Sequence, residues 1–90
     1  MLEPTPTTRF KKDLKRFKHQ IMVIKELNEV ITMLVKMTPL TEKNFDHPLG
    51  GGWKGSRECH VYPDTLLIYR VDEKQNKLFL ERFGSHSELF

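Results

Sequence analysis

Ninety residues with 38% apolar and 10% aromatic side chains suffice for one folded domain with a thin core, and are too apolar for a disordered chain. No stretch approaches the ~18 apolar residues of a membrane span, the first residues lack a signal-peptide pattern, and the single cysteine, Cys59, excludes an internal disulfide. We therefore expect a cytoplasmic protein without membrane association. The net charge of +3 is mild, but residues 9–18 gather six basic side chains, which favours a polyanionic partner or else forms a solvated lysine-rich helix face.

The first forty residues predict an edge strand and two helices. Pro4 and Pro6 confine any strand there to a sheet edge, because proline lacks a backbone donor, and Thr7 or Thr8 can cap the helix that follows. A corner at residues 18–20 separates two apolar stripes at helical spacing, Phe10, Leu14, Phe17 and Ile21 and then Ile21, Ile24, Leu27, Ile31, Leu34 and Val35. One bent helix is the alternative, since no Gly or Pro enforces the corner.

The second half predicts a meander of three strands after a long connection over residues 38–55. Alternation over residues 57–62 places Glu58, His60 and Tyr62 on one face, and Cys59 and Val61 on the face toward the helices. Residues 66–71 would place apolar side chains on both faces of a strand, which predicts the central strand of the sheet. A polar turn over 72–77 then leads to a returning strand over 77–83 and a short tail.

These elements predict an α+β fold over residues 1–90. Its two N-terminal helices pack on one face of a small, mainly antiparallel sheet, made of the three-strand meander and a possible N-terminal edge strand. The other face stays open, and His60 points into it.

Histidines and an aspartate cluster around these strands in a way that suits RNA cleavage without a metal. Such cleavage needs a base for the 2′-hydroxyl, an acid for the leaving oxygen and cations for the phosphate, and histidine suits both proton-transfer roles near neutrality. His47, His60 and His86 are the candidates, with Asp64 as a base or an orienting group. The nearest cations in the sequence are Lys54, Arg57 and Arg82.

Other interpretations of these residues remain open at this point. A single loop histidine is most often a surface residue, and an aspartate after proline is an ordinary turn residue. His60, Asp64 and His86 could instead hold a metal, but no H-x-x-H or H-x-x-x-H pair supports this, so we expect neither a metal nor another cofactor. A non-catalytic RNA-binding or partner-binding module is the alternative from a different class.

Two motifs resemble the YafQ-type toxins, which belong to the RelE-like superfamily of bacterial toxin–antitoxin ribonucleases. The first is D-H-P-L-G-G-G-W-K-G-S-R-E-C-H-V-Y-P-D-T-L-L-I-Y, from Asp46 to Tyr69, and the second is R-F-G-S-H-S-E-L-F, from Arg82 to Phe90. The order of two helices and a meander also agrees, so the resemblance covers nearly the whole chain and implies a RelE-like fold.

The resemblance implies an mRNA interferase that enters the ribosomal A site of the 30S subunit and cleaves mRNA there without a metal, so that translation stops. By the same resemblance, the family's active-site residues fall on His47, His60, Asp64 and His86, a basic residue near the phosphate falls on Arg82, and the aromatic that supports an mRNA base falls on Phe90. It further implies a cognate antitoxin of the DinJ or RelB kind, operator DNA contacted only through that antitoxin, and ribosomal RNA against the basic helix of residues 9–18.

Two positions depart from the family pattern, because Ser56 and Thr65 stand where aromatic residues are common. We expect His86 to act as general acid, His47 or Asp64 as base, and His60 to orient a neighbour or stabilise the phosphate. A free aspartate has a pKa of about 3.9 and is a weak base at neutral pH, which slightly favours His47.

Overall fold

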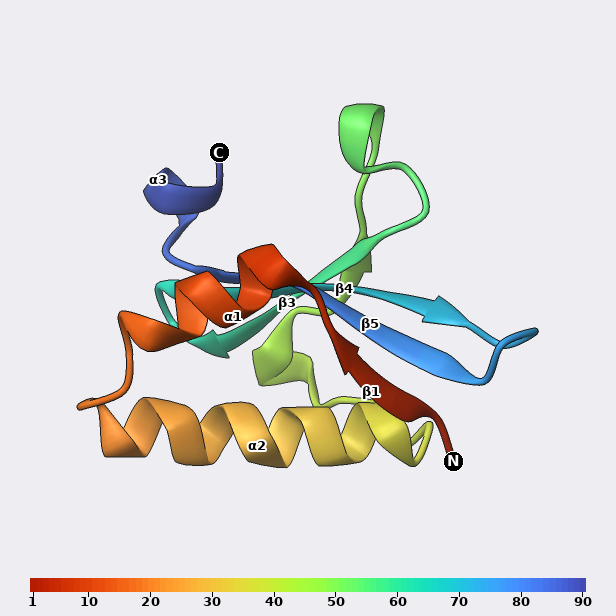
Figure 1. Cartoon of the computed structure of the whole chain (residues 1–90), viewed down its shortest axis with the longest axis horizontal. Helices are drawn as coiled ribbons and strands as arrows, with labels where there is room; N and C mark the ends of the chain where they lie inside the picture. Colours follow the sequence, from red (N-terminus) through yellow and green to blue (C-terminus); the bar gives the residue numbers. More distant parts are fainter.

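The computed structural model describes residues 1–90. Two helices lie on one face of a five-stranded sheet, and a short third helix rises from the opposite face (Figure 1). In chain order the elements are β1 (Glu3–Pro6), α1 (Thr8–Lys15), α2 (Ile21–Val35), the 3-10 helix η1 (Glu42–Asn44), β2 (His47–Pro48), the 3-10 helix η2 (Gly51–Trp53), β3 (Arg57–Tyr62), β4 (Thr65–Asp72), β5 (Lys77–Gly84) and α3 (His86–Leu89).

The strands lie in the order β1-β5-β4-β3-β2, with β1 parallel to β5 and every other neighbouring pair antiparallel. The predicted α+β class is confirmed, as are the meander, the N-terminal edge strand and the central place of β4. None of the helices combines the length and the apolar character that crossing a bilayer requires.

The N-terminal part forms two separate helices rather than one bent helix. The Thr7 hydroxyl accepts a hydrogen bond from the Phe10 amide at 3.1 Å, which makes Thr7 the N-cap of α1 as predicted. Residues 16–19 turn the chain, and α2 begins at Ile21. Because Ile21 lies at this corner, its side chain is 76% exposed and belongs to neither buried stripe, contrary to the prediction.

Helices α1 and α2 cover the sheet with a continuous apolar core. Phe17 contributes a close aromatic contact, with its ring centroid 4.8 Å from that of Phe83 on β5. The buried members of this core are Leu2, Phe10, Phe17, Leu27, Val30, Leu34, Cys59, Val61, Leu67, Tyr69, Leu78, Leu80 and Phe83. Cys59 and Val61 therefore face the helices, as predicted.

Two shifts in strand register change which face side chains occupy. Between His60 and Tyr62, the pairing of β3 with β4 passes over Val61, so Tyr62 packs against the helix-side core instead of sharing the face of His60. The alternation predicted across 57–62 is therefore wrong for Tyr62.

The second shift passes over Glu81 in the pairing of β4 with β5. Leu80 and Phe83 both lie in the helix-side core although three positions separate them, which strict alternation along a strand would not allow. The extra residue brings Arg82 opposite Ile68, and so onto the other face of the sheet.

That other face is partly covered, and not fully open as predicted. Leu66, Ile68 and Leu89 form a second buried cluster, against which Leu49 and Trp53 pack. Leu89 comes from α3, where the sequence predicted only a short tail. Ser85 and Glu88 close a capping box that starts this helix.

Candidate active site

The register of the sheet places the candidate residues of the open face in two rows. His47 lies opposite Glu58, Glu58 opposite Ile68, and Ile68 opposite Arg82, so one row crosses four strands. The next row runs from His60 through Leu66 to Gly84, two residues before His86. With about 4.8 Å between neighbouring strands, the backbones of His60 and Gly84 lie roughly 10 Å apart.

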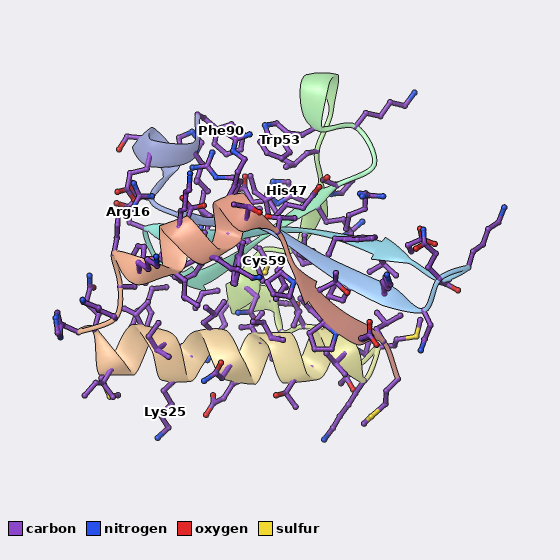
Figure 2. All side chains as sticks on the ribbon, in the orientation of Figure 1. Arg16, Lys25, His47, Trp53, Cys59 and Phe90 are labelled. Carbon is purple, nitrogen blue, oxygen red and sulfur yellow. The ribbon has the colours of Figure 1, made fainter.

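Helix α3 and the η2 loop both stand on this face, on opposite sides of the rows (Figure 1). Figure 2 shows His47, Trp53 and Phe90 on the side of the sheet opposite Lys25 of α2. His47, His60 and His86 therefore share one face with the apolar cluster that contains Leu89 and against which Trp53 packs.

His47 is held in one orientation by the backbone of Phe45. Its Nδ1 lies 2.7 Å from the Phe45 carbonyl oxygen, and because a carbonyl only accepts, Nδ1 must carry the hydrogen. In the neutral ring, Nε2 is then unprotonated and can accept a proton. This arrangement suits a general base.

Nε2 of His47 faces a buried carboxylate that the sequence did not single out. The nearest Glu58 oxygen lies 3.7 Å away, and Glu58 is only 5% exposed. This separation makes Glu58 the ion-pair partner of His47 whenever Nε2 carries a proton. The sequence could not predict this contact, because it depends on the pairing of β2 with β3, and β2 is a strand of only two residues.

The Phe45 ring neighbours the rings of both His47 and His60. Its ring centroid is 6.0 Å from that of His47 and 5.9 Å from that of His60. Buried Asn44 donates a 2.8 Å hydrogen bond to the His60 carbonyl and ties η1 to β3. The Phe45 backbone is left-handed at φ 49°, which costs a non-glycine residue on the order of 1 kcal/mol.

His86 occupies the first position of α3 and is exposed. Its ring centroid lies 5.1 Å from that of Phe90, which is 52% exposed. The histidine predicted to be the acid, at the start of α3, and the aromatic predicted to support a base, just after its end, therefore lie side by side.

Asp64 and Lys54 are exposed and lie on loops. Asp64 belongs to the two-residue turn between β3 and β4, at the sheet end where β5 leads into α3, since Leu66 pairs with Gly84. Lys54 ends η2. Neither side chain has a partner that would fix its position, so the structure leaves both roles as predictions.

Arg57 lies on the opposite face from His60. It pairs with Tyr69 of β4, whose side chain is in the helix-side core, and its Nε donates to Asp46 at 3.2 Å. The Tyr69 hydroxyl donates to the same carboxylate at 2.6 Å. Arg57 thus stabilises the fold beneath the site, and its predicted contact with substrate finds no support in this placement.

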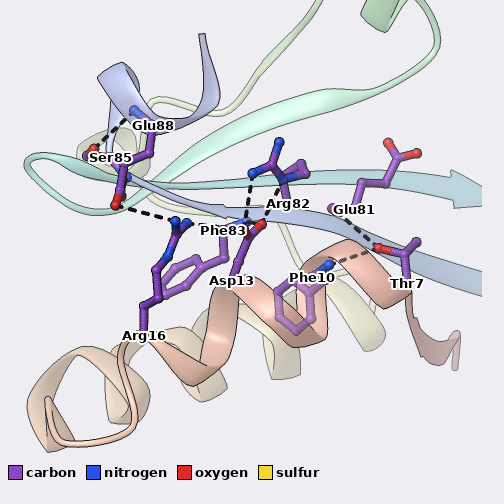
Figure 3. A network of polar contacts seen from close by, with 9 residues as sticks. All are labelled: Thr7, Phe10, Asp13, Arg16, Glu81, Arg82, Phe83, Ser85 and Glu88. Atoms are coloured by element: carbon purple, nitrogen blue, oxygen red, sulfur yellow. Dashed lines mark hydrogen bonds and ion pairs between the residues drawn. The ribbon is translucent and has the colours of Figure 1, made fainter.

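Arg82 lies on the site face but is tied to α1 by a buried aspartate. Its Nε and Nη2 donate to the two Asp13 oxygens at 2.8 and 3.1 Å, and the Phe83 amide donates to Asp13 at 3.0 Å (Figure 3). Of the five N–H donors of a guanidinium, three are not bonded to Asp13, although the Arg82 side chain is only 13% exposed. Arg16 extends the network, because it contacts both Asp13 at 3.1 Å and Glu88 of α3 at 3.8 Å.

Burial by itself would raise the pKa of Asp13, but the hydrogen bonds from Arg82 and Phe83 and the two guanidinium charges outweigh it and hold that pKa below its usual value. Asp13 therefore remains a carboxylate and fixes Arg82 where β5 leads into α3.

Other reactive side chains lack the environment that catalysis would need. Cys59 is fully buried, and burial with the nearby charges of Asp46 and Glu58 raises the pKa of its thiol to about 12. It is therefore a thiol and not a nucleophile at neutral pH. The structure contains no group of three or more His, Cys, Asp or Glu side chains placed to hold a metal ion.

The fold is that of a family of bacterial toxins. A family described as "Bacterial toxin of type II toxin-antitoxin system, YafQ" matches residues 2–90. The chain is 40% identical over 82 residues to the mRNA interferase toxin YafQ of Escherichia coli strain K12. This match covers 90% of this chain and 87% of that protein. The chain belongs to the YafQ family, as the sequence resemblance predicted.

Solved structures agree with this assignment. A metal-bound toxin from Helicobacter pylori is 47% identical with a TM-score of 0.92, and the match covers all of both chains. The toxin in the E. coli DinJ–YafQ complex is 35% identical with a TM-score of 0.87, over 100% of this chain and 99% of that one.

Proposed function

We propose that the protein is an mRNA interferase that cleaves mRNA in the ribosomal A site by metal-free acid–base chemistry. The main support is the arrangement of one face of the sheet, where His47, Glu58, Arg82 and His60 lie in adjacent rows beside the helix that carries His86. The 40% identity to an mRNA interferase toxin agrees with it.

In this proposal His47 is the general base. Nε2 takes the proton of the 2′-hydroxyl, whose oxygen attacks the adjacent phosphorus and forms a 2′,3′-cyclic phosphate. The exposed position of His86 allows it to donate a proton to the leaving 5′-oxygen. His60 and the N–H groups of Arg82 that are not bonded to Asp13 stabilise the charge that develops on the phosphate.

Asp64 is the alternative base, and Lys54 supplies a further cation. Each is exposed and lies on a loop next to the site face, so substrate can approach it. The orientation of His47 by the Phe45 carbonyl is the reason to prefer His47 over Asp64.

The proposed partners follow from surface charge and from the relatives. The exposed basic side chains of α1 and the corner after it suit ribosomal RNA, which brings the site to mRNA in the cytoplasm. A relative in complex with the antitoxin DinJ supports a cognate antitoxin of that kind, through which the toxin reaches operator DNA.

The experiment that tests this function is primer extension on mRNA under translation, with and without active ribosomes. We expect cuts only on translated mRNA, and we expect EDTA pretreatment of the toxin to leave their yield unchanged. Because ribosomes need magnesium, the chelator is removed by desalting before the assay. A toxin whose activity is lost with EDTA and restored by a transition metal would contradict the metal-free mechanism, and a metal-bound H. pylori relative makes this control necessary.

Glu58→Gln tests the role of the buried carboxylate next to His47. We expect kcat to fall about 10- to 100-fold, because the imidazolium of His47 loses its neighbouring charge, which corresponds to roughly 1.4–2.8 kcal/mol. In a His47→Ala background, Glu58→Gln should not lower kcat any further. Equal losses in both backgrounds would show that Glu58 acts on something other than His47.

A further inference from the structure

Phe45 combines an exposed aromatic side chain with a left-handed backbone. Its side chain is 69% exposed although it is large and apolar, and its backbone has a φ of 49° and a ψ of 44°, in the left-handed region that favours glycine. Neither apolar cluster of the protein includes it. Residues held in such conformations concentrate at active sites and ligand sites.

Hydrogen bonds fix the backbone from which the Phe45 ring projects. Its amide donates to the Glu42 carbonyl at 3.0 Å, and its carbonyl accepts from Nδ1 of His47 at 2.7 Å. The preceding residue, Asn44, is buried and bonds to the backbone of His60. A base that stacks on this ring therefore needs no rearrangement of the backbone beneath it.

The neighbours of the ring are the two histidines of the candidate active site on β2 and β3. The His47 ring stands nearly perpendicular to it, at 86°, and the His60 ring is tilted by 39°. A phosphate that contacts these two imidazoles would therefore place an adjoining nucleotide next to Phe45. The flat apolar surface of the ring suits a nucleobase, since every base presents a π-face.

We propose that Phe45 stacks on a base that adjoins the phosphate cleaved by this toxin, and so contributes to substrate specificity. This inference rests on the proposed nuclease function. A purine offers more stacking area than a pyrimidine, so Phe45 favours a purine at that position. The stacked base is a second point of support beside the one predicted for Phe90 on α3.

The test compares cleavage by Phe45 variants on translated mRNA. Phe45→Gly should lower kcat/KM by roughly 5- to 150-fold, the range that corresponds to about 1–3 kcal/mol for one base stack. Its melting temperature should not fall, because glycine adopts the left-handed backbone readily. Phe45→Trp should restore cleavage, and Phe45→Leu, which is apolar but not aromatic, should not.

Met37→Gly is the matched control. Met37 is also left-handed, with φ 58°, and is 57% exposed, but it follows α2 on the helix side of the sheet and contacts neither histidine ring. We expect it to leave cleavage and purine preference unchanged. Full activity and unchanged preference in Phe45→Gly, or equal rescue by leucine and tryptophan, would overturn the stacking role.

The same assay separates this inference from the proposed function. If the wild-type toxin makes no ribosome-dependent cuts, the nuclease function itself fails. If the wild type cuts and His47→Ala does not, while Phe45→Gly cuts as well as the wild type, only the role of Phe45 fails.

Discussion

His86→Ala is expected to lower mRNA cleavage by about 10²–10⁴-fold, the contribution of one well-placed general acid, while the protein remains folded. The imidazole is exposed at the start of α3 and makes no hydrogen bond within the protein, so its removal leaves no buried group unpaired. Leu89 and the capping box of Ser85 and Glu88 still hold the helix in place.

Primer extension on translated mRNA measures this loss, and a thermal melt measures folding. The matched control is His19→Ala, which removes an exposed histidine from the corner between α1 and α2 and should cleave as well as the wild type. Growth arrest by His86→Ala at the level of the wild type would exclude His86 from the mechanism. A lowered melting temperature would instead assign His86 a structural role.

Asp13→Ala is expected to destabilise the protein by about 3–5 kcal/mol, the usual consequence of removing one partner of a buried ion pair. The change leaves the guanidinium of Arg82, whose side chain is only 13% exposed, without its carboxylate, and leaves the Phe83 amide without an acceptor. For a protein of ninety residues this is a large part of the total stability.

Urea unfolding of three variants isolates the cause. Arg16→Ala removes the half-exposed partner of the same aspartate and should cost only about 0–1 kcal/mol. The double change of Asp13 to Leu and Arg82 to Met should regain the part of the lost stability that comes from the unpaired Arg82 charge, but not the part that comes from the Phe83 amide, because leucine offers that amide no acceptor. If Asp13→Ala cost no more than Arg16→Ala, the buried pair would not stabilise the fold.

The pH dependence of stability gives a second readout of the same pair. The pKa of Asp13 lies below its ordinary value of 3.8 in the folded protein, so the folded state binds fewer protons there than the unfolded state. The stabilising contribution is therefore present above pH 3.8 and is lost as the pH falls through the folded pKa. Asp13→Asn should therefore weaken the dependence of the free energy of unfolding on pH below 3.8.

Periodicity predicted the regular elements well because each buries a continuous apolar face. The stripe that includes Phe10 and Phe17 and the run of apolar residues in β4 both reflect direct burial, which local sequence encodes. Periodicity could not predict the two register shifts in the sheet. Passing over Val61 and Glu81 depends on how neighbouring strands pair, and alternation along one strand carries no information about it.

The candidate site was predicted in part. The family motifs located His47, His60 and His86, and the structure places all three on one face. The sequence did not single out Glu58, because its contact with His47 depends on the two-residue strand β2. It did not single out Phe45, because the left-handed backbone of that residue has no signal in the sequence. The ion pair between Arg82 and Asp13 could not be predicted, because the two residues are 69 positions apart and meet only where α1 packs on β5.

Both margins of the sheet resist the growth of fibres. The outer strands β1 and β2 carry Pro4, Pro6 and Pro48, which have no amide hydrogen to offer an incoming strand. Where β3 extends beyond β2, the Asn44 side chain already occupies the His60 carbonyl. A second copy of the chain therefore finds no uninterrupted ladder to extend, so the toxin can be released from a partner without polymerising through its β-sheet.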